Sequence, residues 1–293
     1  MPILQGATQH ITYASSARSR TARTVIRTLE NVTGRLALIR RAAGYEDELA
    51  LGQSFWQVIP ERFGLTLDVA RGNIAAVPAI GPLVVISNHP YGILDGLMMG
   101  HLLDKARGDF RILANSVFCK SDDLTRVLLP ISFDETKQAV QLNLETRARA
   151  LDYLGLGGAI GVFPGGTVST SARPFSRPMD PGWRNFTAKM IARSNATVLP
   201  VFFAGTNSRL FQLASHLHYS LRLGLLLKEF KARMDEPVRV VIGDPICAAR
   251  LAPFHTNPTG MMDFLRKATY DLSPEPVKTY DLGYEFVARY KSR

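Results

Sequence analysis

The chain has 293 residues, 46% hydrophobic and 9% aromatic, which suits one large α/β domain and excludes a disordered protein. A net charge of +10 and a pI of about 9.8 leave nucleic acid, an anionic membrane or an acidic protein as partners, although no nucleic-acid motif is visible. The two distant cysteines argue against a disulfide framework or a structural zinc. No stretch reaches the roughly 18–20 apolar residues of a membrane span, and no signal peptide is evident.

The N-terminal part of the chain is basic. Residues 1–17 are polar and mixed, which predicts a poorly ordered tail. Ser19–Arg41 has apolar residues at helical spacing and seven arginines in or beside it, against one acid, Glu30. Such a helix is either a membrane-surface element or a solvated helix whose apolar stripe packs on the domain, and the two roles are compatible. Tyr45–Pro60 predicts a second helix, with Trp56 at the lipid headgroup level or in the core.

Beyond residue 62, short apolar runs alternate with segments of helical periodicity. The predicted strands are Leu65–Val69, Val84–Ile86, Phe110–Ala114, Leu128–Phe133, Ala159–Phe163, Thr197–Ala204 and Val238–Ile242. The predicted helices are Leu94–Arg107, Thr136–Leu154, Gly182–Ser194 and Ser208–Arg233. This alternation predicts an α/β fold with a largely parallel central sheet flanked by helices. We therefore expect an N-terminal basic, amphipathic helical region, residues 1–62, and an α/β domain, residues 63–293.

The helix predicted over Ser208–Arg233 is rich in leucine between residues 221 and 227. This run is too short to span a membrane, but it suits a wall for an acyl chain or a shallow membrane contact, and equally a buried core helix. His216 and His218 face different sides of a helix and make a poor metal pair.

The candidate catalytic residues lie in the stretch Val84–Gly96. Its apolar strand stops at His89, a Pro/Gly turn follows, and Asp95 falls in the first turn of the next helix. A His at a strand end and an Asp one tight turn later can meet, which is the geometry of an imidazole base held by a carboxylate. Taken alone, the two residues fit a surface-loop His and a helix-capping Asp equally well.

Four motifs occur in order between about residues 65 and 250. They are Asn88-His89 with Asp95 nearby, Phe163-Pro164-Gly165-Gly166-Thr167-Val168-Ser169, Val198-Leu199-Pro200-Val201, and Val240-Val241-Ile242-Gly243-Asp244-Pro245-Ile246. Each is weak alone, but in this order and at these intervals they resemble the lysophospholipid (glycerolipid) acyltransferase family, whose third motif reads Phe-Pro-Glu-Gly-Thr-Arg-Ser. The resemblance implies a glycerolipid acyltransferase-like fold and acyl transfer, with His89 as the base and Asp95 orienting it.

The chain departs from the family pattern at two points. Five residues rather than the usual four separate His89 from Asp95, a pattern that resembles a branch identified as hemolysin-like or aminolipid O-acyltransferases. Gly165 and Val168 stand where the family has Glu and Arg, which help to hold a glycerol-phosphate acceptor. The resemblance therefore implies acyl transfer to a different acceptor.

The resemblance also supplies the expected substrate-binding residues, which are Asn88, Arg111, Asn115, Gly165, Gly166 and Thr167. Arg111 and Asn115 belong to a strand that is similar to the family's second motif, unless Arg111 is merely exposed and Asn115 caps the next turn. The glycines let backbone N–H groups approach a phosphate or an oxyanion, although a tight strand-to-helix turn alone would also use them.

The resemblance implies an O-acyltransferase that moves a fatty acyl group from acyl carrier protein or coenzyme A to the hydroxyl of a lyso-aminolipid, for example of the lyso-ornithine type, in bacterial membrane lipid biosynthesis. The alternatives are acylation of 1-acylglycerol-3-phosphate and a non-catalytic, membrane-surface lipid-binding protein. No metal and no permanently bound cofactor are required. We expect a peripheral protein at the cytoplasmic face of the inner membrane, in contact with the membrane surface and without a nucleic-acid partner.

Overall fold

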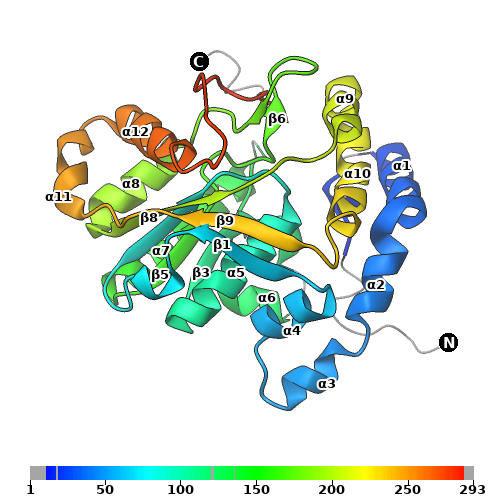
Figure 1. Cartoon of the computed structure of the whole chain (residues 1–293), viewed down its shortest axis with the longest axis horizontal. Helices are drawn as coiled ribbons and strands as arrows, with labels where there is room; N and C mark the ends of the chain where they lie inside the picture. The colour runs from blue at the N-terminus through cyan, green and yellow to red at the C-terminus, as the bar shows by residue number, and fades with distance from the viewer. Residues whose placement is uncertain (1–10, 18, 120–121, 135, 287–293) are drawn as a thin grey trace.

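A seven-stranded sheet forms the centre of the described part of the chain, residues 11–17, 19–119, 122–134 and 136–286 of a computed structural model (Figure 1). In sheet order its strands are β1 (Thr66–Arg71), β9 (Pro237–Ile242), β8 (Thr197–Phe203), β2 (Leu83–Ser87), β5 (Ala159–Val162), β3 (Arg111–Asn115) and β4 (Leu128–Ile131). Neighbouring strands pair in parallel, except β8 with β9. The predicted largely parallel α/β fold is confirmed, and every predicted strand is present to within two residues at its ends.

Strand β2 shows why the sequence predicts a buried sheet. Leu83 and Val85 pack into one hydrophobic cluster, and Val84 and Ile86 pack into another. Because successive side chains of a strand point to opposite faces, each face of this strand needs its own apolar cover. A parallel sheet covered on both sides therefore reads as a continuous apolar run rather than as an alternating one.

Helices cover both faces of the sheet. One cluster holds buried residues of α1 (Arg20–Glu30), α2 (Leu36–Ala42), α3 (Tyr45–Ala50), α4 (Phe55–Arg62), α5 (Ile93–Arg107), α9 (Arg209–Leu217) and α10 (Tyr219–Lys231). The other holds buried residues of α7 (Lys137–Gly155), α8 (Asn185–Ser194), α11 (Ala248–Leu251) and α12 (Pro258–Tyr270). The short elements α6 (Asp122–Val127), β6 (Thr170–Ser171) and β7 (Pro178–Met179) were not predicted, because they are too short to show a period.

The helix predicted over Ser19–Arg41 is present as α1 and α2, joined by a π-helical turn at Asn31–Arg35. Gly34 in this turn lies so near α10 that a Cβ on it would be 2.5 Å from the carbonyl oxygen of Leu227. Glycine weakens an isolated helix, but here it lets two helices meet at backbone contact. Figure 1 shows α1 beside α10, and part of the apolar side of this region, including Ile26 and Leu38, packs on the domain, whereas Val32 stays exposed.

The predicted N-terminal tail is wrong for residues 11–17. Thr12, Tyr13 and Ala14 are buried, whereas residues 1–10 lie outside the described part of the chain. The buried carboxylate of Glu30 accepts hydrogen bonds from the Thr12 hydroxyl and the Tyr13 amide, both at 2.6 Å. These contacts join an aperiodic segment to a helix well downstream, so no local pattern announces them.

Two predicted helices are each divided in two. Tyr45–Pro60 breaks between α3 and α4 around Gly52, whose φ of 88° lies in the left-handed region. Ser208–Arg233 breaks at His218, where an extended backbone ends α9 and the imidazole Nδ1 accepts the Ser220 amide to start α10. Among the described residues, no helix combines the length and the apolarity that crossing a bilayer requires.

Candidate active site

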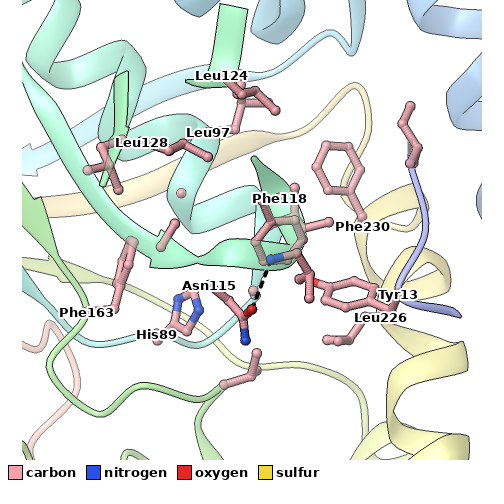
Figure 2. Close-up of a pocket in the computed structure, with 18 of the residues that line it drawn as sticks. Tyr13, His89, Leu97, Asn115, Phe118, Leu124, Leu128, Phe163, Leu226 and Phe230 are labelled. Carbon is pink, nitrogen blue, oxygen red and sulfur yellow. Dashed lines mark hydrogen bonds between the residues drawn. The ribbon is translucent and has the colours of Figure 1, made fainter. Parts of the chain in front are cut away.

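An apolar cavity of about 320 Å³ lies beside the carboxyl ends of β2, β3, β4 and β5, where parallel sheets usually bind ligands (Figure 2). Its apolar lining includes Leu97, Phe118, Leu128, Phe163, Leu226 and Phe230. Helix α10 contributes Leu223, Leu226 and Leu227 to this wall, and its other leucines pack in the core or at its edge. Trp56 also lines the cavity and is buried, which places it in the core rather than at the surface.

His89 and Asp95 meet at one end of this cavity. The imidazole Nδ1 lies 3.0 Å from Oδ2 of Asp95, which is ion-pair distance, although the ring N–H does not point straight at the oxygen. The His89 side chain is 17% exposed and Asp95 is fully buried, so a substrate can reach the imidazole but not the carboxylate. Because Nδ1 faces Asp95, Nε2 is the nitrogen left for a reacting hydroxyl.

The extra residue between His89 and Asp95 is absorbed by the turn that joins β2 to α5. Gly92 has a φ of 87°, which favours glycine, and it places its own amide and that of Tyr91 over the first helical turn. Oδ2 of Asp95 accepts both amides, from Tyr91 at 2.7 Å and from Gly92 at 2.9 Å. Burial raises the pKa of Asp95, and the contacts with His89 and the two amides oppose that rise.

The surroundings fix the orientation of His89. Its ring stacks on Phe163 with the ring centroids 4.2 Å apart and the planes at 27°, as Figure 2 shows. Its backbone amide donates to Oδ1 of Asp180 at 3.2 Å, and its carbonyl accepts the Ser169 amide at 2.8 Å. Asp180 is fully buried and also accepts hydrogen bonds from the Ser169 hydroxyl and the Trp183 indole. It therefore ties the His89 turn to the third motif.

Two of the expected substrate-binding residues lie elsewhere. Asn88 is buried, and its amide group pairs with both the N–H and the carbonyl of Phe203, so it joins β2 to β8 and does not line the cavity. Arg111 is the first residue of β3, at the opposite end of the strand from Asn115. Its guanidinium contacts Asp109 at 2.6 Å and lies over the Tyr153 ring. The structure therefore does not bring these two side chains to the cavity, and nothing in its geometry supports the expected role in substrate binding.

The remaining expected residues gather near the cavity. Asn115 lines it, and its Oδ1 accepts the Val117 amide at 3.1 Å, the hydrogen bond drawn in Figure 2. Gly166 and Thr167 line it as well, but the Gly166 amide donates to the Phe163 carbonyl and so belongs to the turn. Gly165 does not line the cavity, and a Cβ there would lie only 3.3 Å from Cβ of Asp180.

Arg222 of α10 is a cavity residue that sequence reasoning missed. Its guanidinium is buried and donates to the hydroxyls of Thr167, Thr170 and Ser215 and to the carbonyl of Val168. Burial lowers the pKa of Arg222 to about 10, which leaves it charged at neutral pH. The available signal was a single arginine inside the leucine run, since a lone charge on an apolar helix face needs a reason.

Tyr13 is a second residue that sequence reasoning missed. It is buried, lines the cavity and packs edge-on against Phe118 at 5.5 Å (Figure 2). Its hydroxyl lies at the start of α5, where a Cβ on Gly92 would be 3.4 Å away. The segment around Tyr13 therefore completes the wall of the cavity beside the His89 turn.

Known proteins resemble this chain over most of its length. A family model described as Acyltransferase matches residues 18–275, a range that contains His89, Asp95 and Arg222. The lyso-glycine lipid O-acyltransferase of Phocaeicola vulgatus is 23% identical over 220 residues, which cover 71% of this chain and 74% of that protein. The crystal structure of the 1-acyl-sn-glycerophosphate (LPA) acyltransferase PlsC from Thermotoga maritima is similar with a TM-score of 0.46 and 14% identity, over 90% of this chain and 87% of that one.

Proposed function

The chain belongs to the acyltransferase family whose model it matches, and on that premise we propose that it moves a fatty acyl group from an acyl thioester to the hydroxyl of a lyso-aminolipid. The observation that carries the proposal is the His89–Asp95 pair at the end of an apolar cavity. The P. vulgatus relative is named for O-acylation of a lyso-glycine lipid, which supports the same class of acceptor.

His89 acts as the general base in this reaction. Its Nε2 takes the proton of the acceptor hydroxyl while the oxygen attacks the thioester carbonyl and forms the new C–O bond. When the tetrahedral intermediate collapses, the C–S bond breaks and the imidazolium returns the proton to the leaving thiolate. Asp95 orients the ring through Nδ1 and stabilises the imidazolium between the two proton transfers. The thiolate is a good leaving group, so no acyl-enzyme is needed.

The acyl chain of the donor or the acceptor occupies the apolar cavity, against Leu223, Leu226 and Phe230. The thiol carrier is acyl carrier protein or coenzyme A. Both carriers are anionic, which suits a chain with a net charge of +10 but does not distinguish them.

Acylation of 1-acylglycerol-3-phosphate is the second candidate, and one observation is compatible with it. The third motif lacks its usual arginine at Val168, but the guanidinium of Arg222 donates to the Val168 carbonyl at 2.7 Å and to the Thr167 hydroxyl. A cation beside this motif is therefore present, supplied by another element. The positive charge of Arg222 can stabilise an anionic group on the acceptor, either a phosphate or a carboxylate.

Initial rates on the two acceptors test the proposal. With one acyl thioester and one detergent, we expect kcat/KM for an N-(3-hydroxyacyl)glycine to exceed that for 1-acylglycerol-3-phosphate by about tenfold or more, which corresponds to about 1.4 kcal/mol. Thiol release and lipid mass spectrometry give the rate and the product. Reactions without enzyme give the background of non-enzymatic transfer. Equal or faster turnover of the phosphate acceptor would move the protein to the phospholipid branch.

Membrane attachment is proposed at α1 and the helices beside it, on the cytoplasmic face of the inner membrane. Val25, Val32 and Leu36 on the N-terminal helices are exposed, and so are Leu210 and Leu217 on α9. Figure 1 shows α1 and α9 on the same side of the molecule, and α10 packs against both. Apolar side chains beside exposed arginines suit an anionic lipid surface.

Replacing Arg20, Arg23 and Arg27 with glutamine is expected to weaken sedimentation with anionic vesicles severalfold at low salt. Each basic residue near such a surface contributes about 1 kcal/mol, and the effect must fade as added salt shortens the screening length. Lys189, Arg193 and Arg250 on α8 and α11 are suitable targets for a matched triple control. Binding that does not respond to the α1 substitutions, or to salt, would assign these arginines a role other than lipid contact.

A further inference from the structure

We propose that Arg222 is the acceptor-recognition residue, and that its guanidinium binds the free carboxylate of an N-acylated amino acid. This inference rests on the proposed function and adds the feature by which the site would select its substrate. It explains why a buried arginine lines a cavity that is mostly apolar.

Within the described part of the chain, no acid balances the charge of Arg222. Its four hydrogen bonds go to three hydroxyls and one carbonyl, at 2.6, 3.1, 3.2 and 2.7 Å, and all of these acceptors are neutral. Two aromatic rings add weak stabilisation, with the guanidinium carbon 5.0 Å from the Phe211 centroid and 4.2 Å from that of Phe286. No carboxylate among the described residues lies within ion-pair distance of it. A buried charge without a counter-ion is costly, so an anionic ligand would stabilise this arrangement.

Arg222 also lies at the same end of the cavity as His89. It donates to the carbonyl of Val168, and the next residue, Ser169, donates its amide to the carbonyl of His89 at 2.8 Å. Arg222 and His89 thus flank the same short segment of the third motif, and both line the cavity. In an N-(3-hydroxyacyl) amino acid, the hydroxyl and the carboxylate are separated only by a short amide linkage. One molecule can therefore present its hydroxyl to His89 and its carboxylate to Arg222.

The charge of Arg222 favours a carboxylate over a phosphate. Arginine has five N–H donors, and the four contacts of Arg222 use those of Nη1 and Nη2, which leaves the Nε–H without an acceptor among the described residues. One donor and one positive charge match a monoanion. A phosphate monoester carries close to two negative charges at neutral pH, which a single guanidinium balances only in part.

A matched pair of acceptors tests the assignment. N-(3-hydroxyacyl)glycine and its methyl ester differ only in the charge of the head group, and kcat/KM is measured for both with each protein. For the wild-type protein we expect a preference of about 10- to 100-fold for the acid, the range of a hydrogen bond to a charged group. We expect Arg222→Gln to reduce this ratio to near one, and Arg222→Lys to retain part of it. The ratio within one variant does not depend on the fraction of folded protein, so partial misfolding does not imitate the result.

Lys231→Gln is the control, because Lys231 is an exposed cation on the same helix and does not line the cavity. It should leave the acid-to-ester ratio unchanged. An Arg222→Gln variant that keeps the full preference for the acid would overturn the proposal. Two other results for Arg222→Gln would also overturn it, if the acid-to-ester ratio stays intact. They are a raised KM for the acyl donor and a lower rate on 1-acylglycerol-3-phosphate alone, because the anion at Arg222 would then be a phosphate.

Equilibrium binding separates this inference from the proposed function. Trp56 lines the cavity, so its fluorescence is a reporter for titration with N-palmitoylglycine, which lacks the reacting hydroxyl, and with N-palmitoylglycinamide. Tighter binding of the acid that disappears in Arg222→Gln supports the assignment even if no acyl transfer to an aminolipid is found. Equal binding of the acid and the amide by the wild-type protein would overturn it, whatever the enzyme transfers.

Discussion

His89→Ala is expected to lower kcat by about 10²–10⁴-fold, the usual contribution of a general base, while the protein stays folded. The ring contacts Asp95 and Phe163 at the edge of the cavity and fills no part of the sheet core, so its loss should leave the packing of β2 intact. Steady-state thiol release measures the activity. Thermal unfolding followed by circular dichroism checks the fold.

His255→Ala is the matched control for that variant. His255 is exposed at the end of a short turn between α11 and α12, and it does not line the cavity. Its replacement should leave both kcat and the unfolding midpoint unchanged. A folded His89→Ala protein that turns over at a near-normal rate would remove His89 from the reaction.

Asp95→Asn is expected to lower kcat by about 10⁴-fold, because the amide can hold the imidazole in the wrong tautomer and cannot stabilise imidazolium. The amide oxygen can still accept the Tyr91 and Gly92 N–H groups, so the turn before α5 should keep its shape. Loss of activity without loss of the turn would separate orientation of His89 from simple support of the loop. Asp104→Asn, on the same helix, is the control.

The same substitution has a predicted effect on stability. Burial raises the pKa of Asp95 in the folded protein, so the carboxylate is less stable there than in the unfolded chain. For a raised pKa, the stabilisation is complete below the unfolded value of about 3.9 and is lost as pH rises through the folded value. Asn carries no charge, so the unfolding midpoint of Asp95→Asn should match or exceed that of the parent at neutral pH. The difference between the unfolding midpoints of the variant and the parent should shrink towards zero at about pH 4. A difference that grows on acidification would contradict the burial argument.

The sequence predicts those parts of the fold and the site that depend on local patterns. The strand of Val84–Ile86, the turn and Asp95 lie within one short stretch, so their meeting follows from strand, turn and helix geometry alone. Asn115 lines the cavity because it ends β3, and the carboxyl ends of parallel strands share one edge of the sheet, whereas its role in substrate binding stays a prediction. Arg111 was misplaced for the same reason, since the first residue of that strand lies at the opposite edge.

Residues brought to the site by tertiary packing could not be predicted in this way. Tyr13 reaches the cavity because Glu30 holds its backbone, and Arg222 reaches it because α10 packs beside the N-terminal helices. Asp180 lies in a short loop after β7 and ends beneath Gly165, a contact that depends on two segments folding over each other. In the sequence, Tyr13, Arg222 and Asp180 are single residues that belong to no periodic pattern. The residues that they contact in the folded protein lie far away in the chain.

The close approach of Gly34 to Leu227 has a practical consequence for protein production. The two helical segments meet at backbone contact, and beneath them lie leucines of α10 that line the cavity. A shortened form that starts at β1 would expose this leucine surface to solvent, and a large apolar surface of that kind drives aggregation. We therefore expect such a form to aggregate, and we expect added detergent, or replacement of Leu223 or Leu227 by serine, to improve its yield.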